Sequence, residues 1–219
     1  MVPVIWLLGL SGSGKTTLGS LLRIHLESQG HEVEFIDADK FRREHGHTGF
    51  SPEARRANIS AIRDYALQCH SEGKVVIVSA ITPYADMRRE NRRQIPLYRE
   101  VWVRCGLETL VSRDTKQFYA KAAAGKMDLL TGVSDAFDEP TLADLVIDTD
   151  KMDMADCYTM LRDLTEDAID EGEGLNEMGV WGNDDQHFLP FMPSLVSPAP
   201  QVVAAWPVHE SGYALAVNG

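Results

Sequence analysis

Gly9-Leu10-Ser11-Gly12-Ser13-Gly14-Lys15-Thr16 fits the pattern G-x-x-x-x-G-K-[ST] and lies between an apolar run, residues 4–8, and a segment with leucines at helical spacing, residues 15–28. A strand leading into a glycine-rich turn and a helix is the setting in which this pattern binds phosphates. The glycines let backbone N–H groups turn toward a phosphate, and the helix N-terminus adds positive potential. The alternative interpretation is a glycine-rich turn that binds no ligand. The residues expected to contact a nucleotide are Gly9, Ser11, Gly12, Ser13, Gly14, Lys15, Thr16 and Thr17.

Two side chains of this loop have chemistry suited to a triphosphate. The Lys15 ammonium is predicted to bridge the β- and γ-phosphates, and the Thr16 hydroxyl is predicted to bind Mg²⁺. No Asn-Lys-x-Asp sequence is present, so we expect ATP rather than a guanine nucleotide. A phosphate-binding loop identifies a nucleotide but not a reaction, which the rest of the site must supply.

Outward from this loop, β-branched runs alternate with helical patterns. Strands are predicted at residues 4–8, 33–37, 75–80, 101–105 and 145–149, and helices at 15–28, 52–72, 84–94 and 154–169. Such alternation is typical of βα units around a mostly parallel sheet. The predicted fold class is therefore α/β, with three layers and a mostly parallel five-stranded sheet in the middle.

Two segments interrupt the alternation. Residues 114–140 are rich in Lys, Ala, Gly and Asp, and they are too long for an ordinary connection, so we expect a functional loop or lid there. From about residue 171 the composition shifts to Gly, Asn and Pro with scattered aromatic residues. This predicts a domain of residues 1–170 followed by an irregular, acidic, Pro-rich C-terminal extension, residues 171–219.

The charge and hydropathy patterns exclude several classes of partner. The formal net charge is −12, most of it beyond residue 161, so a large nonspecific nucleic-acid surface is not expected. No run of about 18 apolar residues is present, and no basic region precedes the apolar start, so neither a membrane span nor a signal peptide is expected. The three cysteines show no paired spacing. These features predict a cytoplasmic protein with a small-molecule substrate.

An acidic pair, Asp37 and Asp39, follows the second predicted strand. If the strand continues extended, residues two apart lie on the same side. One carboxylate would then organise Mg²⁺ while the other accepts a proton from an acceptor hydroxyl, as in a kinase. The alternative is a solvated loop after a strand. In many P-loop proteins an acidic residue ends the strand beside the P-loop strand, but here the predicted strand at residues 75–80 ends without one. The nearest acidic residues are therefore the pair after the second predicted strand.

Six motifs in order now resemble those of adenylyl-sulfate kinase, the P-loop enzyme that phosphorylates the 3′-hydroxyl of adenosine 5′-phosphosulfate. The resemblance runs over about residues 4–164. It implies a three-layer P-loop kinase fold with a lid, ATP and Mg²⁺ as cofactors, and a homodimer. The motifs are GLSGSGKTT (9–17), IDADKFR (36–42), GFSPEARRANI (49–59), VSAITPY (78–84), SRDTKQFYAKAAAG (112–125) and LTGVSDAFDEP (130–140).

The resemblance also assigns roles to individual residues. Asp39 would be the base for the 3′-hydroxyl, with Asp37 near the metal, while Phe50 would stack on the acceptor's adenine. Arg113 and Lys116 would belong to the lid that covers ATP. Taken alone, Phe50 is equally typical of a core aromatic, and Arg55 of a solvated helix face. The full acceptor set that the resemblance implies is Asp39, Arg42, Phe50, Arg55, Asn58, Ile81, Thr82, Pro83, Lys116, Leu130 and Thr131.

The chain departs from the family pattern at three positions. Ala38 stands where the family has Gly, Ala123 where it has Arg, and Leu130 where it has Phe. That Phe forms the second wall of a sandwich around the adenine, and an aromatic–base stack contributes about 1–3 kcal/mol. The resemblance therefore predicts the reaction type better than the acceptor. The alternatives are a kinase for another hydroxyl and a non-catalytic nucleotide-binding regulator.

Overall fold

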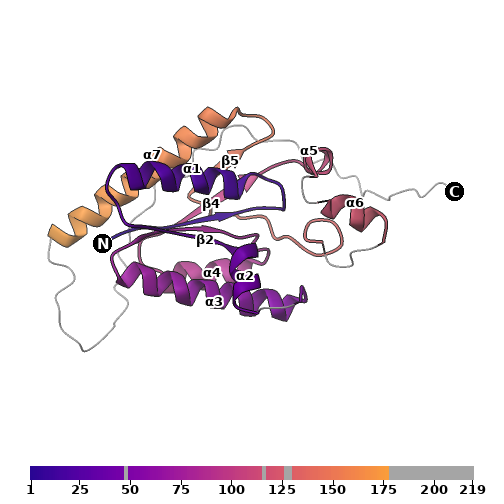
Figure 1. The fold of residues 1–219 in the computed structure, drawn as a ribbon, viewed down its shortest axis with the longest axis horizontal. Coiled ribbons are helices and arrows are strands. Elements are labelled where there is room, and N and C mark those ends of the chain that lie inside the picture. Colours follow the sequence, from indigo (N-terminus) through magenta and orange to yellow (C-terminus); the bar gives the residue numbers. More distant parts are fainter. Residues whose placement is uncertain (47–48, 115–116, 126–129, 178–219) are drawn as a thin grey trace. The chain divides into compact units, whose positions relative to one another are not determined.

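The fold is built on a five-stranded parallel sheet with the strand order β2-β3-β1-β4-β5 (Figure 1). A computed structural model describes residues 1–46, 49–114, 117–125 and 130–177. Each neighbouring pair of strands is parallel, which confirms the predicted α/β class. The strands are β1 (Val4–Leu8), β2 (Val33–Asp37), β3 (Val75–Ser79), β4 (Tyr98–Arg104) and β5 (Leu145–Asp148).

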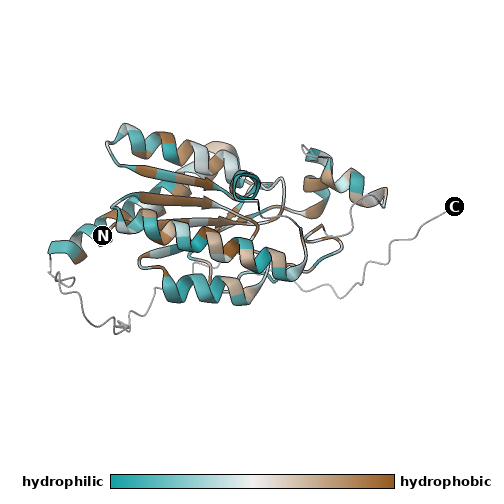
Figure 2. Ribbon diagram, turned by 60° about the horizontal axis from the view of Figure 1, so that its bottom comes forward, coloured by the Kyte–Doolittle hydropathy of each residue, from teal (hydrophilic) through white to brown (hydrophobic). Residues whose placement is uncertain are grey.

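Helices cover both faces of this sheet, which gives the predicted three layers. One face carries α1 (Lys15–Ser28) and α7 (Met154–Glu177), and the other carries α2 (Ala38–Glu44), α3 (Pro52–Ser71) and α4 (Ala85–Gln94) (Figure 1). The central strand β1 is fully buried because its alternate side chains enter two separate cores. Hydropathy colouring shows apolar strands between helices with hydrophilic outer surfaces (Figure 2).

Two short helices lie between β4 and β5 and were absent from the sequence prediction. They are α5 (Leu107–Arg113) and α6 (Phe118–Ala123). A third, smaller core joins them to the segment at residue 130 and consists of Cys105, Leu110, Tyr119 and Leu130. Residues 115–116 and 126–129 of the expected lid lie outside the described residues.

Helix α7 continues past residue 169, where the sequence predicts an end, to Glu177. The Met1 ammonium donates to the Gly172 carbonyl oxygen at 2.8 Å, and Arg99 forms an ion pair with Glu171. A Cβ at position 172 would lie 2.1 Å from the Met1 carbonyl oxygen. Contacts with distant residues therefore stabilise a turn of helix whose glycines favour an end.

The strand β4 also differs from its predicted limits, since it begins at Tyr98 rather than residue 101. Tyr98 pairs in register with Val4 of β1.

No helix within the described ranges is long and apolar enough to cross a bilayer. The division between residues 1–170 and 171–219 stays a prediction, and beyond Glu177 it lies outside the described residues.

Candidate active site

The loop between β1 and α1 has the conformation that its glycine pattern predicts. Gly9, Gly12 and Gly14 have φ angles of 144°, 82° and 103°, which residues with side chains rarely adopt. Gly9 is also limited by space, because a Cβ there would lie 2.2 Å from the Val103 carbonyl oxygen. The loop lies at the carboxyl end of β1, where open α/β sheets bind ligands.

Lys15, the first residue of α1, is only 8% exposed. Its ammonium donates to the Leu10 carbonyl oxygen at 2.8 Å and lies 3.5 Å from Ser13 Oγ. The side chain therefore folds back over the glycine-rich loop. Its positive charge lies inside the phosphate cradle, as the motif predicts.

Three side-chain oxygens meet beside this loop. Thr16 Oγ1 donates to Asp37 Oδ2 at 2.8 Å and lies 3.2 Å from Ser79 Oγ. Hydroxyl and carboxylate oxygens are the ligand types that Mg²⁺ prefers, so this donor set fits such an ion. Ser79 is not among the sequence-predicted residues. The signal that could have found it is a hydroxyl at the carboxyl end of the strand beside the P-loop strand.

The acidic pair is arranged differently from the sequence prediction. The chain turns into α2 directly after Asp37, whose Oδ1 accepts hydrogen bonds from the backbone N–H groups of Asp39 and Lys40, each at 3.0 Å. Asp37 is thus the N-cap of α2, and the prediction of two carboxylates along an extended strand is wrong because capping begins the helix there. Asp39 lies in the first turn of α2. The two carboxylates are consequently held in different ways, since only that of Asp37 caps the helix.

A single pocket gathers residues from both halves of the predicted site. Four of its lining residues were not predicted, namely Ala38, Ser79, Ala80 and Phe118. The phosphate loop and the acceptor segments therefore open into the same space. The predicted residues that line it are Ser11, Gly12, Gly14, Lys15, Thr16, Thr17, Asp37, Asp39, Arg42, Phe50, Arg55, Ile81, Leu130 and Thr131.

Several predicted residues do not line this pocket. Ser13 is fully buried, and its carbonyl oxygen accepts from Thr149 Oγ1 at 2.9 Å. The Arg113 guanidinium donates to the Thr149 carbonyl oxygen at 2.7 Å, which ties the end of α5 to the loop after β5. Lys116 lies outside the described residues. The remaining predicted residues that do not line the pocket are Gly9, Asn58, Thr82 and Pro83.

The part of the pocket predicted to bind the acceptor contains an accessible aromatic ring with two cations close to it. Phe50 is 46% exposed, and the guanidinium carbons of Arg42 and Arg55 lie 4.7 Å and 5.7 Å from its ring centroid. Arg55 is only 5% exposed, and its Nε donates to the Phe50 carbonyl oxygen at 2.9 Å. The alternatives of a core phenylalanine and a solvated arginine are therefore wrong. Burial lowers the pKa of Arg42, and the nearby charge of Asp39 opposes that shift.

Asp135, which the sequence did not single out, joins this side of the pocket to the lid. Arg55 Nε lies 3.3 Å from Asp135 Oδ2, and the Tyr84 hydroxyl donates to the same carboxylate at 3.1 Å. The Asp135 carbonyl oxygen also accepts from Gly132 N at 2.8 Å, which closes a tight turn. The ion pair therefore fixes both the guanidinium and the turn that carries Thr131.

Three buried polar atoms on the acceptor side have no hydrogen-bond partner within the described residues. They are Arg42 Nε, Asn58 Oδ1 and Thr131 Oγ1. A buried polar atom without a partner costs about 1–3 kcal/mol. Two of these residues line the pocket, and the third, Asn58, is 1% exposed on α3. Unpaired polar atoms on two residues that line one pocket, Arg42 and Thr131, are typical of a site whose ligand supplies the missing partners.

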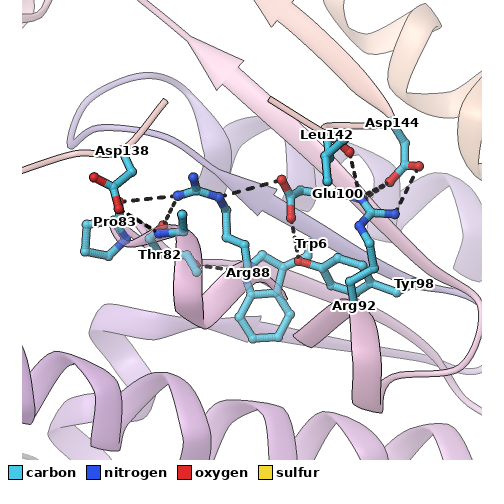
Figure 3. A network of polar contacts seen from close by, with 11 residues as sticks. Trp6, Thr82, Pro83, Arg88, Arg92, Tyr98, Glu100, Asp138, Leu142 and Asp144 are labelled. Atoms are coloured by element: carbon cyan, nitrogen blue, oxygen red, sulfur yellow. Dashed lines mark hydrogen bonds and ion pairs between the residues drawn. The ribbon is translucent and has the colours of Figure 1, made fainter. Parts of the chain in front are cut away.

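The loop between β3 and α4 is held in an unusual conformation. Thr82 has a φ of 46°, which is uncommon for a β-branched residue and marks stored strain. Trp6 Nε1 donates to Thr82 Oγ1 at 2.8 Å, and Arg88 Nη1 donates to the carbonyl oxygens of Thr82 and Pro83 at 3.2 Å and 3.3 Å (Figure 3). Thr82 and Pro83 therefore position Ile81, which lines the pocket, rather than lining it themselves.

The buried Arg55–Asp135 pair gives the first testable prediction. Asp135→Asn removes a countercharge 3.3 Å from a buried guanidinium, so the free energy of unfolding should fall by about 3 kcal/mol. The matched control is Asp86→Asn, which breaks the exposed pair with Arg56 at 2.9 Å and should cost less than about 1 kcal/mol. Urea unfolding of both variants measures the difference. Equal losses would show that burial does not govern the Asp135 contact.

Comparisons with known proteins agree with this geometry. The family described as adenylylsulphate kinase matches residues 1–148. A probable adenylyl-sulfate kinase from Archaeoglobus fulgidus is 40% identical over 68% of this chain and 97% of its own length. An adenylyl-sulfate kinase from Chloroflexus aurantiacus is 41% identical over 72% and 86%.

A solved structure extends the likeness to three dimensions. The structure of the Mycobacterium tuberculosis APS kinase CysC in complex with AMPPNP and APS is 29% identical, with a TM-score of 0.68, and the match covers 78% of this chain and 98% of that chain. The sequence match, the shared fold and the P-loop with its adjoining acceptor pocket lead to one conclusion. This chain belongs to the adenylyl-sulfate kinase family.

Proposed function

We propose that this chain is an adenylyl-sulfate kinase. It transfers the γ-phosphate of ATP to the 3′-hydroxyl of adenosine 5′-phosphosulfate and releases ADP and 3′-phosphoadenosine 5′-phosphosulfate. The single observation that carries the proposal is one pocket lined at one side by the P-loop and at the other by Arg42, Phe50 and Arg55. The family membership and the complex of a relative with AMPPNP and APS support it.

The P-loop residues hold the triphosphate. Lys15 supplies a buried positive charge within the loop, where it stabilises negative charge on the transferring group. Phosphoryl transfer depends mainly on positioning and charge stabilisation. Residues 114–140 are proposed to act as the lid, and the Tyr119 hydroxyl, which donates to the Ser11 carbonyl oxygen at 2.9 Å, holds α6 against the P-loop.

We propose Thr16 and Asp37 as the side chains that hold Mg²⁺, with Ser79 beside them. When bound, the ion neutralises charge on the β- and γ-phosphate oxygens. Thr16 Oγ1 and Asp37 Oδ2 are 2.8 Å apart, so both oxygens serve one site. Asp37 remains tied to the backbone of α2 through its other oxygen, which fixes the carboxylate's position.

Asp39 is proposed to accept the proton of the acceptor hydroxyl. The acceptor oxygen then bonds to the γ-phosphorus, the bond from that phosphorus to the β–γ bridging oxygen breaks, and ADP leaves. Asp39 suits this task because it lines the pocket from the first turn of α2, whereas Asp37 already caps that helix. A positioned base of this kind contributes about 10²–10⁴-fold to a rate.

The acceptor is proposed to bind beside the two cations and the aromatic ring. Arg42 and Arg55 attract its phosphosulfate, and the exposed ring of Phe50 stacks on its base. Thr131, which lines the pocket, offers an unpaired buried oxygen to its polar groups, whereas the unpaired oxygen of Asn58 lies on a residue that does not line the pocket. Ligand binding would give hydrogen-bond partners to buried polar atoms that have none within the described residues.

An acceptor comparison tests the proposal. The purified chain with Mg²⁺ and ATP should phosphorylate adenosine 5′-phosphosulfate at the 3′-position, with a kcat/KM about 10²-fold above that for 5′-AMP. ADP release without an acceptor is the control for hydrolysis. Leu130 stands where the family pattern has an aromatic residue, which supports the alternative that the acceptor is a different compound. Transfer to a sugar alcohol in preference to adenosine 5′-phosphosulfate would establish that alternative. ATP binding without transfer to any acceptor would instead indicate a regulator.

The homodimer that the resemblance implies and the cytoplasmic location that the composition indicates stay predictions. A homodimer predicts twice the chain mass in light scattering at micromolar concentration. Cytoplasmic location predicts full recovery of the chain in the soluble fraction of its native cells. Both measurements are independent of the catalytic assay.

A further inference from the structure

The pocket contains a second aromatic ring to which the resemblance assigns no role. Phe118, the first residue of α6, lines the pocket together with Phe50 and Leu130. Phe50 comes from the loop before α3, so the two rings reach the pocket from different segments of the chain. A flat base held between two surfaces needs apolar contact on both of its faces.

Leu130 lines the pocket but, as a leucine, offers little surface to it. It is 4% exposed, and its side chain belongs to the small core with Cys105, Leu110 and Tyr119. Phe118 is only partly buried and packs on the outside of the same core. Phe118 therefore packs against this core and also lines the pocket.

The position of Phe118 is fixed by contacts on both sides along α6. The Asp114 carboxylate accepts from the backbone N–H groups of Tyr119 and Ala120 at 3.1 Å and 2.9 Å. The Tyr119 hydroxyl donates to the Ser11 carbonyl oxygen of the P-loop at 2.9 Å. A side chain preorganised in this way loses little conformational entropy when a ligand binds.

We infer that Phe118 is the residue that contacts the second face of the acceptor's base, opposite Phe50. The inference rests on the proposed function and deepens it. The family pattern places an aromatic ring at position 130, where this chain has Leu130, and Phe118 supplies a ring to the same pocket from α6. The base-stacking surface is thus kept, with its ring on α6.

Four enzymes test the inference: the unchanged chain, Phe118→Leu, Leu130→Phe and the double variant. Phe118→Leu keeps an apolar side chain but removes the ring, so the KM for adenosine 5′-phosphosulfate should rise about 5- to 150-fold, the range expected for one base stack. The KM for ATP should change by less than about twofold. In the double variant the ring returns at position 130, and the acceptor KM should recover to within about threefold of the unchanged chain.

Phe35→Leu is the matched control, because Phe35 on β2 packs against the apolar core beside α1 and does not line the pocket. It should leave both KM values unchanged. Titration of 5′-AMP in the presence of ADP gives a second measurement that needs no turnover. Phe118→Leu should weaken the binding of 5′-AMP by the same factor. Ribose 5-phosphate, which has no base, should bind equally to Phe118→Leu and to the unchanged chain.

The outcomes separate this inference from the proposed function. If the unchanged chain does not phosphorylate adenosine 5′-phosphosulfate, the proposed function fails, whatever the variants do. If it does, an unchanged acceptor KM in Phe118→Leu overturns the inference, as does an equal rise in the KM for ATP. A double variant no better than Phe118→Leu also overturns it. Thermal unfolding of each variant verifies that the folded protein is compared.

Discussion

Asp39→Asn is expected to lower kcat by about 10²–10⁴-fold while the Kd for ATP stays within about twofold. The amide keeps the size of the side chain but cannot accept the proton of the acceptor hydroxyl at neutral pH. Asp39 lines the pocket and is not the residue that caps α2, so the helix should remain in place. Steady-state turnover with adenosine 5′-phosphosulfate and equilibrium binding of ATP measure the two quantities separately.

Glu44→Gln is the matched control for this variant. Glu44 lies on the same helix, 3.8 Å from Lys40 in an exposed pair, and its neutralisation should leave kcat unchanged. A kcat for Asp39→Asn within about threefold of the unchanged enzyme would remove Asp39 from the mechanism. A loss of ATP affinity as large as the loss of kcat would place the residue on the nucleotide side instead.

Lys15→Met is expected to reduce kcat/KM by about 10³-fold or more. The buried ammonium lies inside the phosphate loop, 2.8 Å from the Leu10 carbonyl oxygen, so a bound triphosphate would meet its charge without water between them. Methionine has a similar length but no charge and cannot donate. The same assay of kcat and KM for both substrates measures the loss.

Lys40→Met provides the comparison, because Lys40 is exposed on α2 and its loss removes the same charge from the protein. It should change kcat/KM by less than about threefold. Circular dichroism establishes that Lys15→Met is folded, since the loop also loses one hydrogen bond. Activity of a folded Lys15→Met within tenfold of the unchanged enzyme would contradict a role for this charge in transfer.

Local sequence patterns predicted the strands and long helices because those patterns act over a few neighbouring residues. The run at residues 4–8 and the leucines after it form β1 and α1 within the predicted limits. Predictions were poorer where contacts between distant residues decide the limits of an element. Helix α7 continues through Gly172 because the Met1 ammonium and Arg99 hold that turn, and these contacts join residues far apart in the chain.

The acidic pair shows a second kind of limit. Its residue types and spacing indicated metal binding and proton transfer, but alternation along a strand placed both carboxylates on one side. In the structure Asp37 caps α2 and contacts Thr16, which leaves Asp39 in a different environment. Whether an Asp continues a strand or caps a helix depends on what the next turn packs against, and in α2 that is the core that contains Ala38 and Phe41.

The sequence by itself determined the phosphate loop, the α/β class and the family, because each depends on contiguous residues whose order alone carries the signal. Only the tertiary structure decided how the acceptor side is assembled. The pairing of Arg55 with Asp135, the contact of Thr16 with Ser79 and the entry of Phe118 into the pocket join segments far apart in the chain. Such contacts are selected by the packing of the whole fold, so no local pattern records them.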